Sequence, residues 1–130
     1  ATARAALGQG DAAAAAADTR RALQLTLALG EAPPSLMHLA FAAEWALAQG
    51  DAAWALRAAQ VCLLQPELSS RRRPELQRTL AAARARLDKE TTARLLADAA
   101  QLHWHAAAHE ALGMLRGQES ADPAAGVQRA

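Results

Sequence analysis

The chain has 130 residues, with 14 Lys and Arg against 13 Asp and Glu, and 52% of its residues are hydrophobic with Ala in excess. This length suits one domain, and the Ala content favours helices. The balanced charge gives no electrostatic argument for general binding to nucleic acid or an anionic membrane, which leaves only local patches for such contacts. The single cysteine, Cys62, excludes an intrachain disulfide framework and favours the cytoplasm, and no apolar run reaches the roughly 18 residues of a membrane-spanning helix.

One short phrase occurs twice: residues 7–13 (LGQGDAA) return at residues 47–53 (LAQGDAA), 40 positions later. Repetition at this period is typical of stacked helical hairpins. Gly50 follows an apolar helix and suits a left-handed residue at the helix end, and Asp51 then suits the N-cap of the next helix. Each copy therefore predicts a helix, a tight turn and an antiparallel helix.

The first half of the chain predicts four helices separated by Gly and Pro. A short helix covers residues 2–8, and a second begins at residue 11 and ends at Gly30. The third helix, over residues 35–49, follows a Pro-Pro break and is apolar on two sides, so we expect neighbours on both. The fourth begins at Asp51 and stops before residue 66.

The second half predicts a polar connector over residues 69–74, an amphipathic helix to Leu87 and a helix over residues 91–115. Between the two helices, Lys-Glu-Thr replaces the Gln-Gly-Asp of the earlier turns. The chain therefore either turns near residues 88–91 into a third hairpin or continues as one rod. Residues 1–116 form the predicted domain, and residues 117–130 a flexible tail.

The middle hairpin resembles a tetratricopeptide-like repeat. Ala43 stands where that family has a small residue for helix contact, Gly50 where it has its turn Gly, and Ala55 where it has its second small packing residue. The resemblance implies an all-α fold, a right-handed superhelix of about three antiparallel helical hairpins. The Ala-rich hairpins with Gln-Gly-Asp-Ala turns are also similar to helical-repeat regions of large bacterial transcriptional regulators and related signalling ATPases.

The resemblance also implies a regulatory or adaptor module that binds a protein or peptide in the groove lined by the first helix of each hairpin. The groove positions carried over are Arg4, Met37, Glu44, Gln77 and Arg84. Three of them, Arg4, Glu44 and Arg84, recur at 40-residue steps. They form either a row that contacts the ligand or a ladder of weak ion pairs between helices.

Two other features are candidate interfaces. The run Arg71, Arg72 and Arg73 is either a solvated face or a contact for an acidic protein, and the lack of interleaved aromatic residues argues against nucleic acid. Trp54 either packs in the core or anchors a partner or a homo-oligomer interface. A module that serves mainly to dimerise its parent chain is therefore a further alternative.

His105 and His109 lie four residues apart on one predicted helix, a spacing that can hold a divalent metal. Two ligands are fewer than a tetrahedral site needs, so we expect a solvated face and no cofactor, with a metal or small-ligand sensor as the alternative. No nucleophile has a nearby base, and the Gly-Gln-Gly at residues 8–10 is not followed by the Lys of a phosphate loop. We therefore do not expect this protein to be an enzyme.

Overall fold

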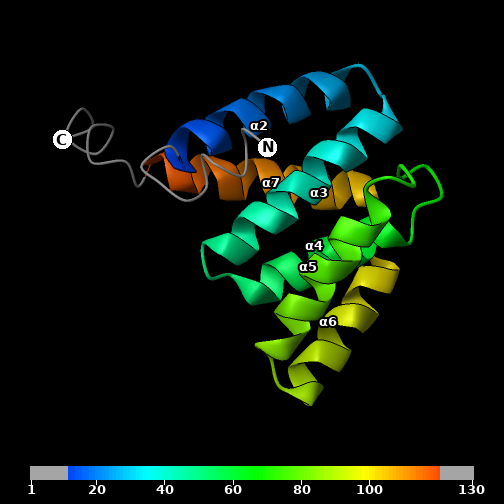
Figure 1. Cartoon of the computed structure of the whole chain (residues 1–130). Coiled ribbons are helices and arrows are strands. Elements are labelled where there is room, and N and C mark those ends of the chain that lie inside the picture. Colours follow the sequence, from blue (N-terminus) through cyan, green and yellow to red (C-terminus); the bar gives the residue numbers. More distant parts are fainter. Residues whose placement is uncertain (1–11, 121–130) are drawn as a thin grey trace.

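The computed structural model describes residues 12–120. In this part of the chain all the regular structure is helical (Figure 1), in the order α2 (Ala12–Ala28), α3 (Ala32–Ala48), α4 (Ala52–Leu63), α5 (Arg73–Ala85), α6 (Lys89–Gln101) and α7 (Trp104–Ser120). The predicted all-α fold class is confirmed. The helix predicted over residues 2–8 lies outside the described residues, and the right-handed superhelix stays a prediction.

The turn between α3 and α4 has the predicted form. Gly50 adopts a left-handed φ of 95°, and the N–H of Asp51 donates to the carbonyl of Ala46 at 2.9 Å, which closes the last turn of α3. The side chain of Asp51 then accepts from the N–H of Trp54 at 3.1 Å and caps α4. Gly30 has the same role in the turn from α2 to α3, where it adopts a left-handed φ of 70°.

The start of α3 and the next turn differ from expectation in their details. α3 begins at Ala32 rather than near residue 35, because proline is well suited to the first turn of a helix. The chain turns after α5 without a glycine, so the single rod is wrong, and α5 and α6 both pack mainly on α4. Asp88 makes this turn by accepting from the N–H of Thr91 at 2.6 Å, and this bond holds the pKa of the Asp88 carboxyl below its usual range.

The single helix predicted over residues 91–115 is wrong. The chain leaves the helical conformation at Leu102, with φ −92° and ψ 123°, and a new helix begins at Trp104. His103 makes the break locally stable, because its ring Nδ1 accepts from the N–H of His105 at 3.1 Å and its carbonyl from the N–H of Ala107 at 3.1 Å. α7 then continues to Ser120, so the predicted boundary between domain and tail falls inside this helix.

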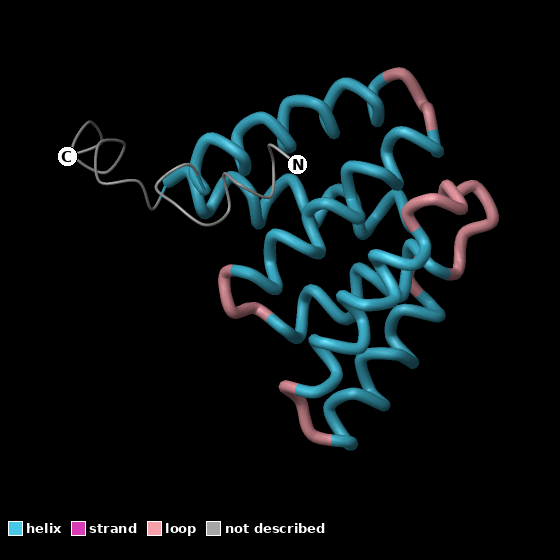
Figure 2. The backbone as a smooth tube through the Cα atoms, viewed as in Figure 1, coloured by secondary structure: helices cyan, strands magenta, loops and turns pink. Residues whose placement is uncertain are grey.

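α4 lies at the centre of the molecule and packs against α3, α5 and α6 (Figure 1). The last helix, α7, returns to lie along α2 and α3, so the chain closes on itself (Figure 2). The largest fully buried side chains include Trp45, Leu23, Leu36, Leu39, Leu56, Leu76 and Leu115. They are set among buried alanines, as the composition predicts. None of the described helices is long and apolar enough to cross a membrane.

Replacing Gly50 with Ala should lower the free energy of unfolding by about 1–2 kcal/mol, because a Cβ disfavours the left-handed φ even where space is open. Gly113→Ala is the matched control: Gly113 is an exposed residue within α7, and the same methyl group should stabilise the protein by about 0.5–1 kcal/mol. Urea unfolding measures both, and equal signs for the two variants would contradict the predicted turn energetics.

Candidate functional site

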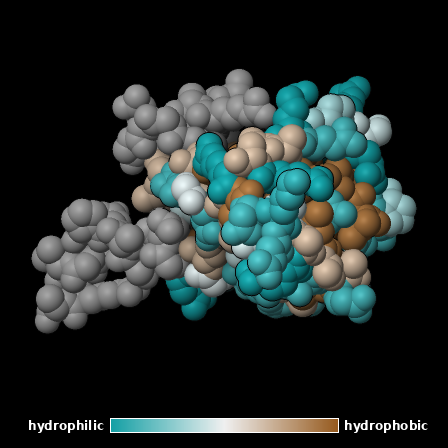
Figure 3. All heavy atoms as spheres, turned by 90° about the horizontal axis from the view of Figure 1, so that it is seen from below, coloured by the Kyte–Doolittle hydropathy of each residue, from teal (hydrophilic) through white to brown (hydrophobic). Residues whose placement is uncertain are grey.

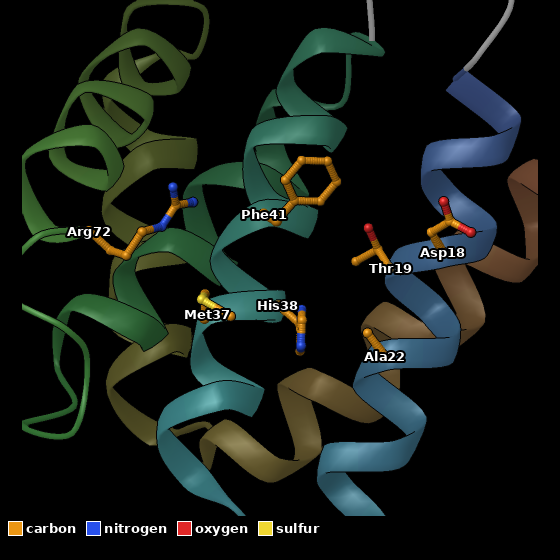
Figure 4. Close-up of a pocket in the computed structure, with 7 residues that line it drawn as sticks. All are labelled: Asp18, Thr19, Ala22, Met37, His38, Phe41 and Arg72. Carbon is orange, nitrogen blue, oxygen red and sulfur yellow. The ribbon is translucent and has the colours of Figure 1, made fainter. Parts of the chain in front are cut away.

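A groove of about 370 Å³ runs between α2 and α3 (Figure 4). It is lined by Asp18, Thr19 and Ala22 from α2, by Met37, His38 and Phe41 from α3, and by Arg72 from the connector before α5. In Figure 4 the α2 residues face α3 on one side, and Arg72 lies on the other side of α3. The groove therefore combines residues from three segments of the chain.

A buried hydrogen-bond chain fixes α2 against α3 where the hairpin turns. The Ser35 hydroxyl donates to Thr26 Oγ1 at 2.9 Å, and the Thr26 hydroxyl donates in turn to the carbonyl of Leu23 at 3.2 Å. Both hydroxyl-bearing residues are buried, so neither can exchange this bond for water without opening the hairpin. The two long walls of the groove are thus held in a fixed relation.

The surface of the groove is largely apolar and extends beyond its lining. Met37 is 45% exposed, although it is a large hydrophobic residue. Leu25, exposed to 61%, follows Ala22 at i+3 on the same side of α2. Leu29, exposed to 62%, comes directly after the end of α2, where its N–H donates to the carbonyl of Leu25 at 3.0 Å. These apolar side chains form a stripe beside the groove that no described residue buries.

The connector arginines occupy three different environments. Arg72 donates to Glu44 at 2.6 Å and to Glu75 at 2.8 Å, which fixes its guanidinium between α3 and α5. Arg73 donates to the carbonyls of Leu63 at 2.9 Å and Gln65 at 2.6 Å, at the C-terminal end of α4. Arg71 is exposed. The run predicted as one interface is therefore mostly engaged in holding α3, α4 and α5 together.

The charges near the groove lie at its edges. Burial lowers the pKa of His38, so the neutral ring is the form expected at pH 7. Asp18 pairs with Arg21 one turn along α2, and Arg72 is paired as described above. The middle of the groove consequently presents a neutral surface formed by Ala22, Met37, His38 and Phe41.

The described members of the predicted partner-binding set do not lie in one row. Met37 lines the groove, and Glu44, two turns further along α3, holds Arg72. Gln77 is exposed on α5. Arg84 lines a separate cleft between α5 and α6 and, among the described residues, forms no ion pair, so no Glu44–Arg84 ladder exists. Arg4 lies outside the described residues.

The remaining candidates have structural surroundings that the sequence did not show. Trp54 is half-buried and packs against two groups of buried residues, one that includes Leu39 and Trp45 and one that includes Leu56 and Leu95. The rings of His105 and His109 lie edge to face, with centroids 4.8 Å apart, on the exposed side of α7. Within residues 12–120 no group of three or more His, Cys, Asp or Glu side chains is placed to hold a metal ion.

The sequence could have indicated the α2 side of the groove. Asp18, Ala22, Leu25 and Leu29 recur at i, i+4, i+7 and i+11, the spacing of one helix face, but they are not uniformly apolar. Phe41, which follows Met37 by one turn on α3, carries the same signal on the opposite wall.

A scan of protein-family models and searches of curated proteins and of solved structures find no match to this chain.

The Arg72–Glu44 pair should contribute to stability, because the two side chains are only 24% and 10% exposed. A double-mutant cycle with Arg72→Gln and Glu44→Gln should give a coupling energy of about 1–2 kcal/mol in urea unfolding. The exposed pair Arg21–Asp18 serves as the control and should give no measurable coupling. Similar coupling in the two cycles would show that Arg72 does not brace the groove wall.

The Cys62 thiol should be unreactive in the folded protein. It is fully buried, and this burial raises its pKa to about 12, against a smaller opposing effect of Arg72. At pH 8 an aromatic disulfide reagent should label the native protein only as fast as it opens, and label it at once in urea. Rapid native-state labelling would show that the thiol is reached by solvent.

The raised pKa of Cys62 also predicts that the free energy of unfolding falls as the pH rises from about 9 towards 12, because the thiol ionises first in the unfolded chain.

Proposed function

We propose that this protein is a protein-interaction module of the tetratricopeptide-like kind, which binds an apolar segment of a partner polypeptide in the α2–α3 groove. One observation carries the proposal. Four large hydrophobic residues are exposed in the described part of the chain, and three of them, Leu25, Leu29 and Met37, lie in or beside this groove. A cluster of exposed apolar side chains rimmed by charge is the usual mark of a binding surface.

The groove is suited to a partner whose contacting residues are apolar. Met37 and Phe41 offer a flexible and an aromatic contact on one wall, and the neutral His38 lies between the walls. The ion pairs of Asp18 and Arg72 are already formed at the edges, so binding does not have to strip water from an unpaired charge there.

Rigid walls favour affinity. The Ser35–Thr26 bond and the Arg72 contacts fix α2, α3 and the start of α5 before a partner arrives. Less ordering is then needed on binding, and more of the gain from covering Leu25, Leu29 and Met37 remains as affinity. The resemblance to helical-repeat regions of bacterial regulators extends the proposal to a regulatory role in the cytoplasm.

The test is a peptide-display selection on the wild-type protein, followed by affinity measurement of the selected peptides on variants. Met37→Glu and Leu25→Glu, at exposed positions beside the groove, should weaken binding at least about tenfold, because each places a charge on the apolar surface. Ala97→Glu is the matched control, since it adds the same charge at an exposed position of α6 and should leave binding unchanged.

Peptides that bind all three variants equally would overturn the assignment to this groove. A stable dimer of the wild-type protein that Met37→Glu dissociates would also overturn it, because a second copy would then be the occupant. Sedimentation of the wild type and the variant separates these outcomes.

A further inference from the structure

A second cleft, of about 420 Å³, opens at the other end of the molecule, beside the turn from α5 to α6. It is lined by Arg84, Leu87, Lys89, Thr92, Ala93 and Leu96. Leu87 and Leu96 are half-buried, and the two charged residues of the lining, Arg84 and Lys89, are exposed cations. Viewed from this end, the surface is mainly hydrophilic with hydrophobic residues gathered in patches between (Figure 3).

The cleft corresponds to a surface that is covered elsewhere in the same chain. The N-caps Asp51 and Asp88 lie 37 residues apart, and this register aligns α5 and α6 with α3 and α4 in sequence. The packing differs, because α3 packs directly against α4, whereas α5 and α6 both pack mainly on α4. The lining of the cleft then matches Leu47, Gly50, Ala52, Ala55, Leu56 and Ala59 in that order.

In α3 and α4 most of these residues are buried, although Leu47 is half-buried and Gly50 is exposed, and α5 and α6 pack over α4. Ala52, Ala55 and Leu56 form one cluster with Ala83 of α5 and Leu95 of α6. The guanidinium of Arg86 also donates to the carbonyl of Leu47 at 3.1 Å. The chain therefore contains one example of what fits such a surface, namely helices that present Ala and Leu.

In the described chain Leu87 and Leu96 pack inward against that same cluster, but no later helix covers their outer side. The last helix, α7, packs mainly against α2 and α3, with a smaller contact to α4. The open surface differs from the covered one at two positions. Arg84 and Lys89 stand where the covered surface has the uncharged Leu47 and Ala52. The lining contains these two cations and no carboxylate, so it favours an occupant with negative charge beside its apolar contact.

We propose that the α5–α6 cleft binds an acidic amphipathic helix of a partner protein, whose Leu and Ala side chains pack on Leu87 and Leu96 and whose carboxylates pair with Arg84 and Lys89. Charge complementarity argues for a different protein rather than a second copy of this chain. In a symmetric dimer through this cleft, Arg84 and Lys89 would face the same cations of the other copy. The site is separate from the α2–α3 groove.

The test uses two synthetic helical peptides with the same Leu-Ala face, one flanked by Glu and one by Lys, and follows their binding by fluorescence anisotropy at low salt. Wild-type protein should bind the Glu peptide at least about tenfold more tightly than the Lys peptide. The double variant Arg84→Glu with Lys89→Glu should reverse this preference. Both substitutions are at exposed positions, so the fold should persist, and circular dichroism checks this.

Arg78→Glu with Arg116→Glu is the matched control, because it changes the net charge equally at exposed positions outside the cleft. It should keep the preference for the Glu peptide, and so should Met37→Glu, which alters only the α2–α3 groove. Equal affinity of wild type for the two peptides, an equal loss in the control, or a wild-type dimer that Arg84→Glu with Lys89→Glu dissociates would each overturn the proposal.

Discussion

The arrangement of the helices depends on the small side chains of α4. This helix is in contact with α3, α5 and α6, and its buried residues are Ala52, Ala55, Leu56, Ala58, Ala59, Val61 and Cys62. Because most of these side chains are a single methyl group, neighbouring helices can approach α4 closely from several directions. Larger residues from other helices, such as Trp45 and Leu76, fill the remaining volume. The cleft beside the turn from α5 to α6 depends on this packing, because both of these helices rest on α4.

The local elements could be predicted where the signal was itself local. Gly50 and Asp51 specify their turn through backbone conformation and a side-chain cap, so the α3–α4 hairpin was evident from the sequence. The break before α7 was not, because residues 91–115 contain neither proline nor an interrupted pattern strong enough to end a helix. His103 can cap the new helix, but the contacts of α7 with α2 and α3, which are distant in sequence, accompany the break.

Individual residues of the candidate site were predictable from local patterns, but their meeting in one groove was not. The sequence indicated Met37 as a groove position of a helical repeat and Arg72 as part of a basic run, so the two residues belonged to unrelated hypotheses. What brings them to one groove is the course of the connector, whose length and direction no helical pattern encodes. The three consecutive arginines show the limit clearly, since identical neighbours in sequence bind carboxylates, bind backbone carbonyls or face solvent.

The return of α7 onto α2 changes how stability is distributed along the chain. In an open array of repeats each unit contacts only its neighbours, so an end can unravel while the rest persists. Here the first and last described helices are partners, and their contacts join residues that are far apart in the chain. Forming these contacts closes a long loop, which costs chain entropy, and losing them frees α2 and α7 together. The molecule is therefore expected to fold and unfold as one cooperative unit, despite its repeated sequence.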